Sequence, residues 1–230
     1  MPLIGIARGI YLVGGSMLTY PLDANIYLIL TRKGKGVVID SGSGLGFENL
    51  LRNLLELGIN PFRDLKYLII THCHIDHAGG ASAFYYNLGV KTVAHEPDSL
   101  FIRKGNMDKT LAKIFGLEFK PSPITVNLRK EYETLSLDEL ILEIIHTPGH
   151  TLGHISIYFE TYGNRVLALG DTMFFEEESY TKDARILKES LSKILKLDFD
   201  IVLEGHNYIP KNGKAFVEEF LAKLDKFQSS

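Results

Sequence analysis

Four side chains of the types that bind metal ions fall within six residues, directly after a short apolar segment, Tyr67-Leu68-Ile69-Ile70. The apolar segment predicts a strand that is buried on both faces. The four side chains are His72, His74, Asp76 and His77. In an extended chain, residues two apart point to the same side, so His72 and His74 converge while Cys73 faces away. A turn after them brings the other two to the same point, so the fold must contain a core strand that ends in a metal-ligating cluster.

Three further residues of the same types lie at the ends of later predicted strands, namely His150, Asp171 and His206. Because strand ends gather at one edge of a sheet, we expect these residues to join the cluster in a single site. Five histidines and two aspartates exceed the four ligands of one tetrahedral zinc ion, so the sequence predicts two metal ions. Two dications carry a charge of about +4, and a carboxylate between them lowers the cost of burying it. Asp171 is the candidate for this bridge.

The donor types restrict the identity of the metal. Imidazole nitrogen with a minority of carboxylate oxygen suits zinc, iron, manganese or cobalt. The single cysteine, Cys73, is expected to be a buried, inert thiol, and without an available thiolate copper(I) and iron–sulfur clusters are disfavoured. We therefore expect two divalent metal ions as cofactors, with zinc in first place and iron or manganese as alternatives.

The rest of the chain alternates between short apolar segments and amphipathic ones. Strands are predicted at 10–13, 25–30, 36–40, 67–70, 91–94, 140–145, 155–159, 165–169 and 201–203. Helices are predicted at 47–57, 81–87, 186–195 and 215–227, with one or two short helices in 97–116. Residues 1–20 lack the charged start and cleavage site of a leader and are predicted to form a strand. The chain divides into two halves, and in each half strands are followed by helices. This pattern predicts two sheets packed face to face with helices outside, in a single domain spanning residues 1–230.

Composition excludes several classes of protein. The 230 residues include 25 Lys plus Arg and 28 Asp plus Glu, a net charge of −3 that argues against a general polyanion binder. Hydrophobic residues make up 45% of the chain, as in ordinary globular proteins. No apolar run approaches the ~18 residues needed to span a bilayer. One cysteine cannot form an internal disulfide, which is typical of a reducing compartment, so we expect a cytoplasmic protein.

Five short motifs occur in one order along nearly the whole chain: Asp40-Ser41-Gly42, His72-x-His74-x-Asp76-His77, the His-Thr-Pro-Gly-His-Thr run containing His150, Gly170-Asp171-Thr172 and Gly205-His206. Together they resemble the metallo-β-lactamase fold superfamily, and most closely its glyoxalase II-like hydrolase branch. The resemblance implies an α+β fold, an αββα sandwich of two mixed β-sheets flanked by helices, with the metals at one edge. It also implies that the first metal is held by His72, His74 and His150, the second by Asp76, His77 and His206, with Asp171 as the bridge.

The same resemblance implies a dinuclear metal-dependent hydrolase. In such an enzyme a metal-bridging hydroxide attacks a small carbonyl ester, thioester or lactone, and a metal stabilises the oxyanion that forms. Asp76 is the candidate catalytic residue, because it is placed both to ligate a metal and to orient the nucleophile's proton. Two alternatives stay open: a mononuclear iron persulfide dioxygenase and a non-catalytic metal-stabilised binding module.

The segment after Asp171 departs from that branch. Glyoxalase II-type relatives usually carry a Gly- and Arg-containing element there, whereas this chain has Met173-Phe174-Phe175 and then the acidic run Glu176-Glu177-Glu178. The departure argues against a glutathione substrate. We still expect a small-molecule substrate.

Several further residues are candidates for supporting roles. Asp40 and His146 each lie at a predicted strand end, where they could orient a metal-binding histidine by hydrogen bonding. The candidates for substrate contact are Phe174, Asn207 and Tyr208, and segment 96–123 is the candidate for a pocket wall. His95 and His154 are expected to be structural. We expect no nucleic-acid or membrane partner, and a homodimer stays open.

Overall fold

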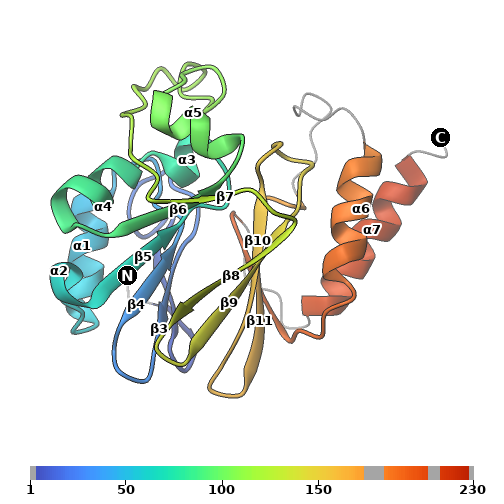
Figure 1. Ribbon diagram of the computed structural model, residues 1–230, viewed down its shortest axis with the longest axis horizontal. Helices are drawn as coiled ribbons and strands as arrows, with labels where there is room; N and C mark the ends of the chain where they lie inside the picture. The colour runs from blue at the N-terminus through green and yellow to red at the C-terminus, as the bar shows by residue number, and fades with distance from the viewer. Residues whose placement is uncertain (1–3, 174–183, 207–212, 228–230) are drawn as a thin grey trace.

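Two β-sheets packed face to face, each covered by helices on its outer side, form the computed structural model, which describes residues 4–173, 184–206 and 213–227 (Figure 1). Both sheets contain parallel and antiparallel strand pairs. The predicted fold class, an α+β sandwich of two mixed sheets flanked by helices, is therefore confirmed. Within the described ranges, no helix has both the length and the apolar character needed to cross a bilayer.

The first sheet has the strand order β1-β2-β3-β4-β5-β6-β7. Its strands are β1 (Ile4–Ala7), β2 (Ile10–Gly14), β3 (Ile26–Leu30), β4 (Gly36–Ile39), β5 (Leu65–Ile69), β6 (Lys91–His95) and β7 (Val126–Leu128). The pairs from β1 to β4 are antiparallel, and those from β4 to β7 are parallel. The carboxyl ends of β4 and β5 therefore lie side by side at one edge of the sheet.

The second sheet has the strand order β12-β11-β10-β9-β8. Its strands are β8 (Tyr132–Leu137), β9 (Leu140–His146), β10 (Ile155–Thr161), β11 (Asn164–Gly170) and β12 (Ile201–Glu204). Strands β8 to β11 pair antiparallel, whereas β11 and β12 pair parallel. As a result β9, β11 and β12 run in the same direction, and the loops that follow them start from one edge.

Helices occupy three places in the molecule (Figure 1). Helices α1 (Phe47–Glu56), α2 (Pro61–Asp64) and α4 (Ala81–Leu88) lie outside the first sheet, and α6 (Ala184–Ile194) and α7 (Gly213–Phe227) lie outside the second. The short helices α3 (Ile75–Ala78) and α5 (Asp98–Lys104) lie at the upper edge in Figure 1. Helix α1 ends as its sequence predicts, because Gly58 follows it with a φ of 76° that glycine adopts without strain.

Three apolar layers hold the sandwich together. The first lies between the first sheet and its helices and includes Leu68 and Phe84. The second lies between the two sheets and includes Ile69 and Ile157, and the third lies under α6 and α7. Leu68 and Ile69 are neighbours on β5 and enter different layers, because successive strand residues point to opposite faces. This is why the segment before the histidine cluster is apolar at every position.

The structure differs from the sequence prediction in short elements. The predicted N-terminal strand is two strands, β1 and β2, with turns from Gly15 onward, and segment 97–116 contains α5 alone followed by turns. The elements α2, α3, β7 and β8 were not predicted, mainly because they are only three to six residues long. The sequence does contain a helix-start signal for α2. Asn60 accepts hydrogen bonds from two backbone amides of α2, and Pro61 occupies the first turn of this helix.

Replacing Phe84 tests the layer under α4. Its ring is fully buried and meets Phe47 edge-on, with 5.6 Å between ring centroids. We expect Phe84→Ala to lower the free energy of unfolding by about 3–5 kcal/mol, because the substitution leaves a cavity. Tyr86→Ala is the control on the same helix, since that side chain is 66% exposed, and it should cost no more than about 0.5 kcal/mol. If chemical denaturation showed that both variants lower the free energy of unfolding equally, this assignment of the core would be contradicted.

Candidate metal centre

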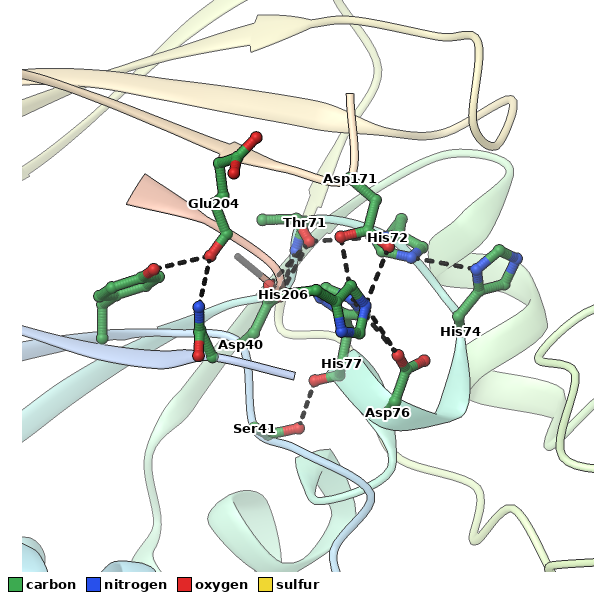
Figure 2. A network of polar contacts seen from close by, with 12 residues as sticks. Asp40, Ser41, Thr71, His72, His74, Asp76, His77, Asp171, Glu204 and His206 are labelled. Carbon is green, nitrogen blue, oxygen red and sulfur yellow. Dashed lines mark hydrogen bonds and ion pairs between the residues drawn. The ribbon is translucent and has the colours of Figure 1, made fainter. Parts of the chain in front are cut away.

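All seven predicted ligands meet at the edge where the strand ends gather; Figure 2 shows six of them. His72 and His74 follow β5, and Asp76 and His77 lie on the single turn of α3. The other three come from the loops after β9, β11 and β12 and are His150, Asp171 and His206. The turn predicted between the two pairs in the first motif is thus a one-turn helix, and it brings the second pair under the first.

The first triad consists of three buried histidines. Nδ1 of His74 lies 3.1 Å from Nε2 of His72 and 2.9 Å from Nε2 of His150. All three nitrogens face one another. This is the grouping that the sequence resemblance implies for the first metal.

The second triad consists of Asp76, His77 and His206. Nε2 of His206 lies 3.3 Å from Nε2 of His77 and 3.2 Å from Oδ2 of Asp76. His77 is fully buried, whereas His206 is partly exposed. The second triad is therefore the one that faces the outside.

Asp171 lies between the two triads. Its Oδ1 lies 3.3 Å from Nε2 of His77. Its Oδ2 lies 3.2 Å from Nε2 of His206 and 3.5 Å from Nε2 of His150. One carboxylate thus reaches nitrogens of both triads, which is the position required of a bridging ligand. Gly205 makes room for it, because a Cβ there would lie 2.0 Å from Oδ1 of Asp171.

These separations fit divalent ions. Four donors arranged tetrahedrally at 2.0–2.1 Å from a zinc ion lie ~3.3 Å from one another. The donor–donor distances in both triads scatter around that value, from 2.9 to 3.6 Å. Imidazole nitrogens with two carboxylates also form the donor set preferred by zinc, iron and manganese. The residues present therefore fit two divalent ions that share Asp171.

Asp40 fixes the tautomer of one histidine in each triad. Its Oδ2 lies 2.8 Å from Nδ1 of His77, and because a carboxylate only accepts, that nitrogen carries a proton, which leaves Nε2 as the nitrogen that can bind a cation (Figure 2). The hydroxyl of Thr71 donates to Asp40, so its oxygen accepts from Nδ1 of His72 at 3.1 Å. Nε2 of His72 is then also free of hydrogen. Asp40 thus contacts a histidine of the predicted ligand set, as the sequence analysis expected, and its supporting role stays a prediction; Thr71 was not foreseen.

Electrostatics differ between the triads. Burial and the neighbouring imidazole of His150 lower the pKa of His74 to about 3. Burial would also lower the pKa of His206, but contacts with Asp171 and Asp76 raise it to about 9. Burial also lowers the pKa of His72, so His72 and His74 are neutral, which is the form that binds metals. In the second triad a cation would replace the proton on His206 and pair with the same carboxylates.

Asp98 on α5 is a supporting residue that the sequence analysis missed. The carboxylate is buried and accepts hydrogen bonds from the backbone of Cys73 at 2.9 Å, the hydroxyl of Thr151 at 2.6 Å and the backbone of Gly153 at 2.8 Å. Cys73 lies between two ligands of the first triad, and Thr151 follows the third. Asp98 therefore joins the two loops that must come together to form this triad.

Other histidines near the centre have different roles. His154 is buried and accepts a hydrogen bond from the backbone of Asp171 at Nε2, so it is structural, as expected. His146 was predicted to orient a ligand, and the structure corrects this. Its Nε2 donates to the carbonyl of Leu152, and its ring stacks on His95 with 4.1 Å between centroids. His146 lies on the same face of β9 as Leu142 and Ile144, which points it at the first sheet rather than at a ligand.

The remaining predicted residues are placed as follows. Phe174, Asn207 and Tyr208, the candidates for substrate contact, lie outside the described residues. Cys73 is buried, and its thiol contacts the carbonyl of Lys109 at 3.3 Å, so it faces away from the triads. Segment 96–123 contributes Phe115 to a cavity of about 190 Å³ that reaches Asp76 and His206.

Changing Asp40 to Asn should weaken metal binding. Asn tolerates the positive φ of 62° at this position, but its amide nitrogen cannot accept from His77. We expect zinc affinity to fall by about 10- to 100-fold in competition with a chelator, as for other residues that support a metal ligand. Asp138→Asn is the matched control, because Asp138 also has a positive φ, of 52°, and lies away from the triads. Unchanged zinc affinity in Asp40→Asn would rule out this role.

Asp98→Asn tests the link between the two loops of the first triad. The added amide nitrogen would face hydrogen-bond donors, so the loops should separate and metal affinity should fall about tenfold or more. Glu133→Gln is the control, because Glu133 likewise accepts from two backbone amides, those of Arg129 and Lys130, without contacting a ligand loop. Equal metal affinities of the two variants would show that Asp98 does not position the triad.

Comparison with known proteins agrees with this geometry. The family model described as the metallo-β-lactamase superfamily matches residues 19–206, a region that contains all seven residues. A probable metallo-hydrolase of Methanocaldococcus jannaschii is 32% identical over 155 residues, which are 67% of this chain and 69% of that protein. The hydroxyacylglutathione hydrolase GloC of Haemophilus influenzae is 32% identical over 192 residues, or 79% of this chain and 84% of that protein.

Solved structures show the same fold. The metallo-β-lactamase GOB-18 from Elizabethkingia meningoseptica superposes with a TM-score of 0.78 and 27% identity, over 98% of this chain and 90% of that one. These similarities, together with the two triads, support a metal-dependent hydrolase. The chain belongs to the metallo-β-lactamase superfamily, in its glyoxalase II-like branch.

Proposed function

We propose that the protein is a dinuclear metal-dependent hydrolase of a small carbonyl ester, thioester or lactone. The observation that carries the proposal is that the cavity of about 190 Å³ reaches two ligands of the second triad, Asp76 and His206. A structural metal site is closed to the outside, whereas a catalytic site keeps a position open for water or substrate. The access from this cavity therefore favours catalysis over a metal-stabilised binding module.

The chemistry follows from the donor set. Two divalent ions, zinc in first place and iron or manganese as alternatives, would supply a water of lowered pKa and a Lewis acid for the substrate carbonyl. Asp171 and the histidines hold their donor atoms in place before substrate arrives, so little reorganisation is needed during the reaction. Thr71 and Asp40 contribute by keeping His72 and His77 in the tautomers that ligands require.

We assign to Asp76 the role of orienting the nucleophilic water and accepting its proton. Burial would raise its pKa, but contacts with His77 and His206 lower it, so the carboxylate is ionised at neutral pH and can accept a proton. Asp76 also lines the cavity, where a substrate carbonyl would enter. Its Oδ2 faces His206, which orients the group.

The relatives support the class of substrate without defining it. GloC is named as a hydroxyacylglutathione hydrolase, and the hydrolysis of such a thioester is the type of reaction proposed here. The segment in which the sequence departs from glutathione-specific relatives, around Phe174 to Glu178, lies outside the described residues. We therefore propose the reaction type and leave glutathione as one member of the test panel.

Metal analysis combined with an activity panel tests the proposal. We expect about two metal ions per chain after repletion, and hydrolysis of at least one ester, thioester or lactone that a chelator abolishes. Asp171→Ala should lose one of the ions and on the order of 10² or more in kcat/KM, because it removes the shared ligand. Asp198→Asn is the control, because that exposed carboxylate pairs with Arg165 away from the triads.

Other outcomes would identify the alternatives. Oxygen consumption with a persulfide, seen with iron and absent with zinc, would indicate the mononuclear dioxygenase. Bound metal without turnover on the whole panel would indicate a binding module. Fewer than one bound metal ion per chain after repletion, with no further loss of bound metal in Asp171→Ala, would refute the dinuclear centre.

A further inference from the structure

The cavity beside the second triad has apolar walls. Leu22 comes from the loop between β2 and β3, Ile75 from α3, and Phe115 from the turns between α5 and β7. Pro21 completes the apolar lining, and the metal-binding end is formed by Asp76 and His206. A group that fills this cavity would therefore lie against hydrocarbon on its sides and against the proposed metal centre at one end.

The charged groups of the cavity disfavour an anion. Among the described residues that line it there is no lysine or arginine, and apart from the two ligands the charged one is Asp23. The carboxylate of Asp23 is buried and accepts from the hydroxyl of Thr19 at 2.6 Å and from the backbone of Ser43 at 2.7 Å. Burial raises the pKa of Asp23, although the hydrogen bonds from Ser43 and Thr19 act in the opposite direction. A second carboxylate in the same space would be repelled.

Apolar side chains adjacent in sequence to the cavity lining are exposed. Phe115, which lines the cavity, is 46% exposed, and Ile114 and Met17, the chain neighbours of the lining residues Phe115 and Ser16, are 76% and 71% exposed. Large exposed apolar side chains are common singly, whereas several of them close to a cavity are typical of a binding surface. The nearest cation on the Phe115 loop, Lys113, pairs with Asp108 at 3.2 Å instead of lining the cavity.

We propose, on the basis of the hydrolytic function above, that this cavity binds the acyl part of the substrate and selects an uncharged apolar chain. The carbonyl carbon would then lie at the end formed by Asp76 and His206, and the chain would extend along Leu22 and Phe115 toward the rim. The cavity volume of about 190 Å³ limits the length of chain that can be buried, so longer chains should gain nothing once the cavity is filled.

A chain-length series tests the selection. For the metal-loaded protein with acyl thioesters from acetyl to decanoyl, kcat/KM should rise about fourfold for each added methylene until the cavity is filled, and then level off. Phe115→Ala should flatten this slope, because the chain loses one wall. If kcat/KM of the parent protein stays constant or decreases as the acyl chain is lengthened, the proposal is overturned.

A charge comparison tests the same proposal independently of length. Succinyl and 4-methylpentanoyl thioesters have nearly the same shape, but only the first ends in a carboxylate. We expect the neutral substrate to be preferred about tenfold or more, and Leu22→Lys to reduce or reverse that preference. Ile141→Lys is the matched control, because Ile141 is an exposed apolar residue on β9 away from the cavity, and it should leave the ratio unchanged. A succinyl preference in the parent protein would overturn the proposal.

A binding measurement separates failure of the site from failure of the function. In methyl-labelled protein, titration with hexanamide should shift the NMR signals of Leu22 and Ile75, whereas the anion succinamate should not. Shifts without turnover of any ester, thioester or lactone would refute the proposed hydrolysis and retain the apolar site. Turnover without these shifts would refute the apolar site and retain the hydrolysis.

Discussion

The buried carboxylate of Asp40 lies between the ends of two parallel strands and needs hydrogen-bond donors there. The candidate metal centre depends on which groups donate to it. An unpaired charge in that position would cost several kcal/mol. The carboxylate accepts from the backbone and hydroxyl of Thr71 at the end of β5 and from Nδ1 of His77 on α3. Each of these contacts fixes a ligand, because Thr71 orients His72 and His77 is itself a donor. Satisfying one charge thus orders both triads.

Charge also explains why so many carboxylates gather at one edge of the sandwich. Asp40, Asp76, Asp98 and Asp171 are largely buried within a few residues or hydrogen bonds of the triads. Their four negative charges would balance the +4 of two divalent ions, so the region would be close to neutral with the ions bound. Without cations, histidines such as His206 take up protons in their place. The arrangement is therefore one that metal binding stabilises, and folding and metal affinity are coupled.

The parts of the fold that the sequence predicted are those with a periodic or continuous apolar signal. Segment 67–70 is apolar because β5 is buried on both faces, and the histidines after it are at the strand end, where ligands of an α/β site occur. Asp98 gave no such signal, because its partners are 25, 53 and 55 residues away in the chain. His146 was expected to orient a ligand because it lies at a strand end, whereas the alternation of β9 places it on the face that points at the first sheet.

The sequence gives little indication of the cavity beside the second triad, because its walls are mainly loops without periodicity. These walls are nevertheless attached to the segment that carries the candidate ligands. The backbone of Ala24, two residues after Leu22, donates to the carbonyl of Asp76 at 3.1 Å. On the other side, the backbone of Ile75 donates to the carbonyl of Thr110, in the turns that carry Phe115, at 2.8 Å. Both walls are therefore attached to α3, the helix that carries two members of the second triad, Asp76 and His77. Substitutions in either loop can therefore change the shape of the cavity while α3 keeps the cavity in contact with Asp76.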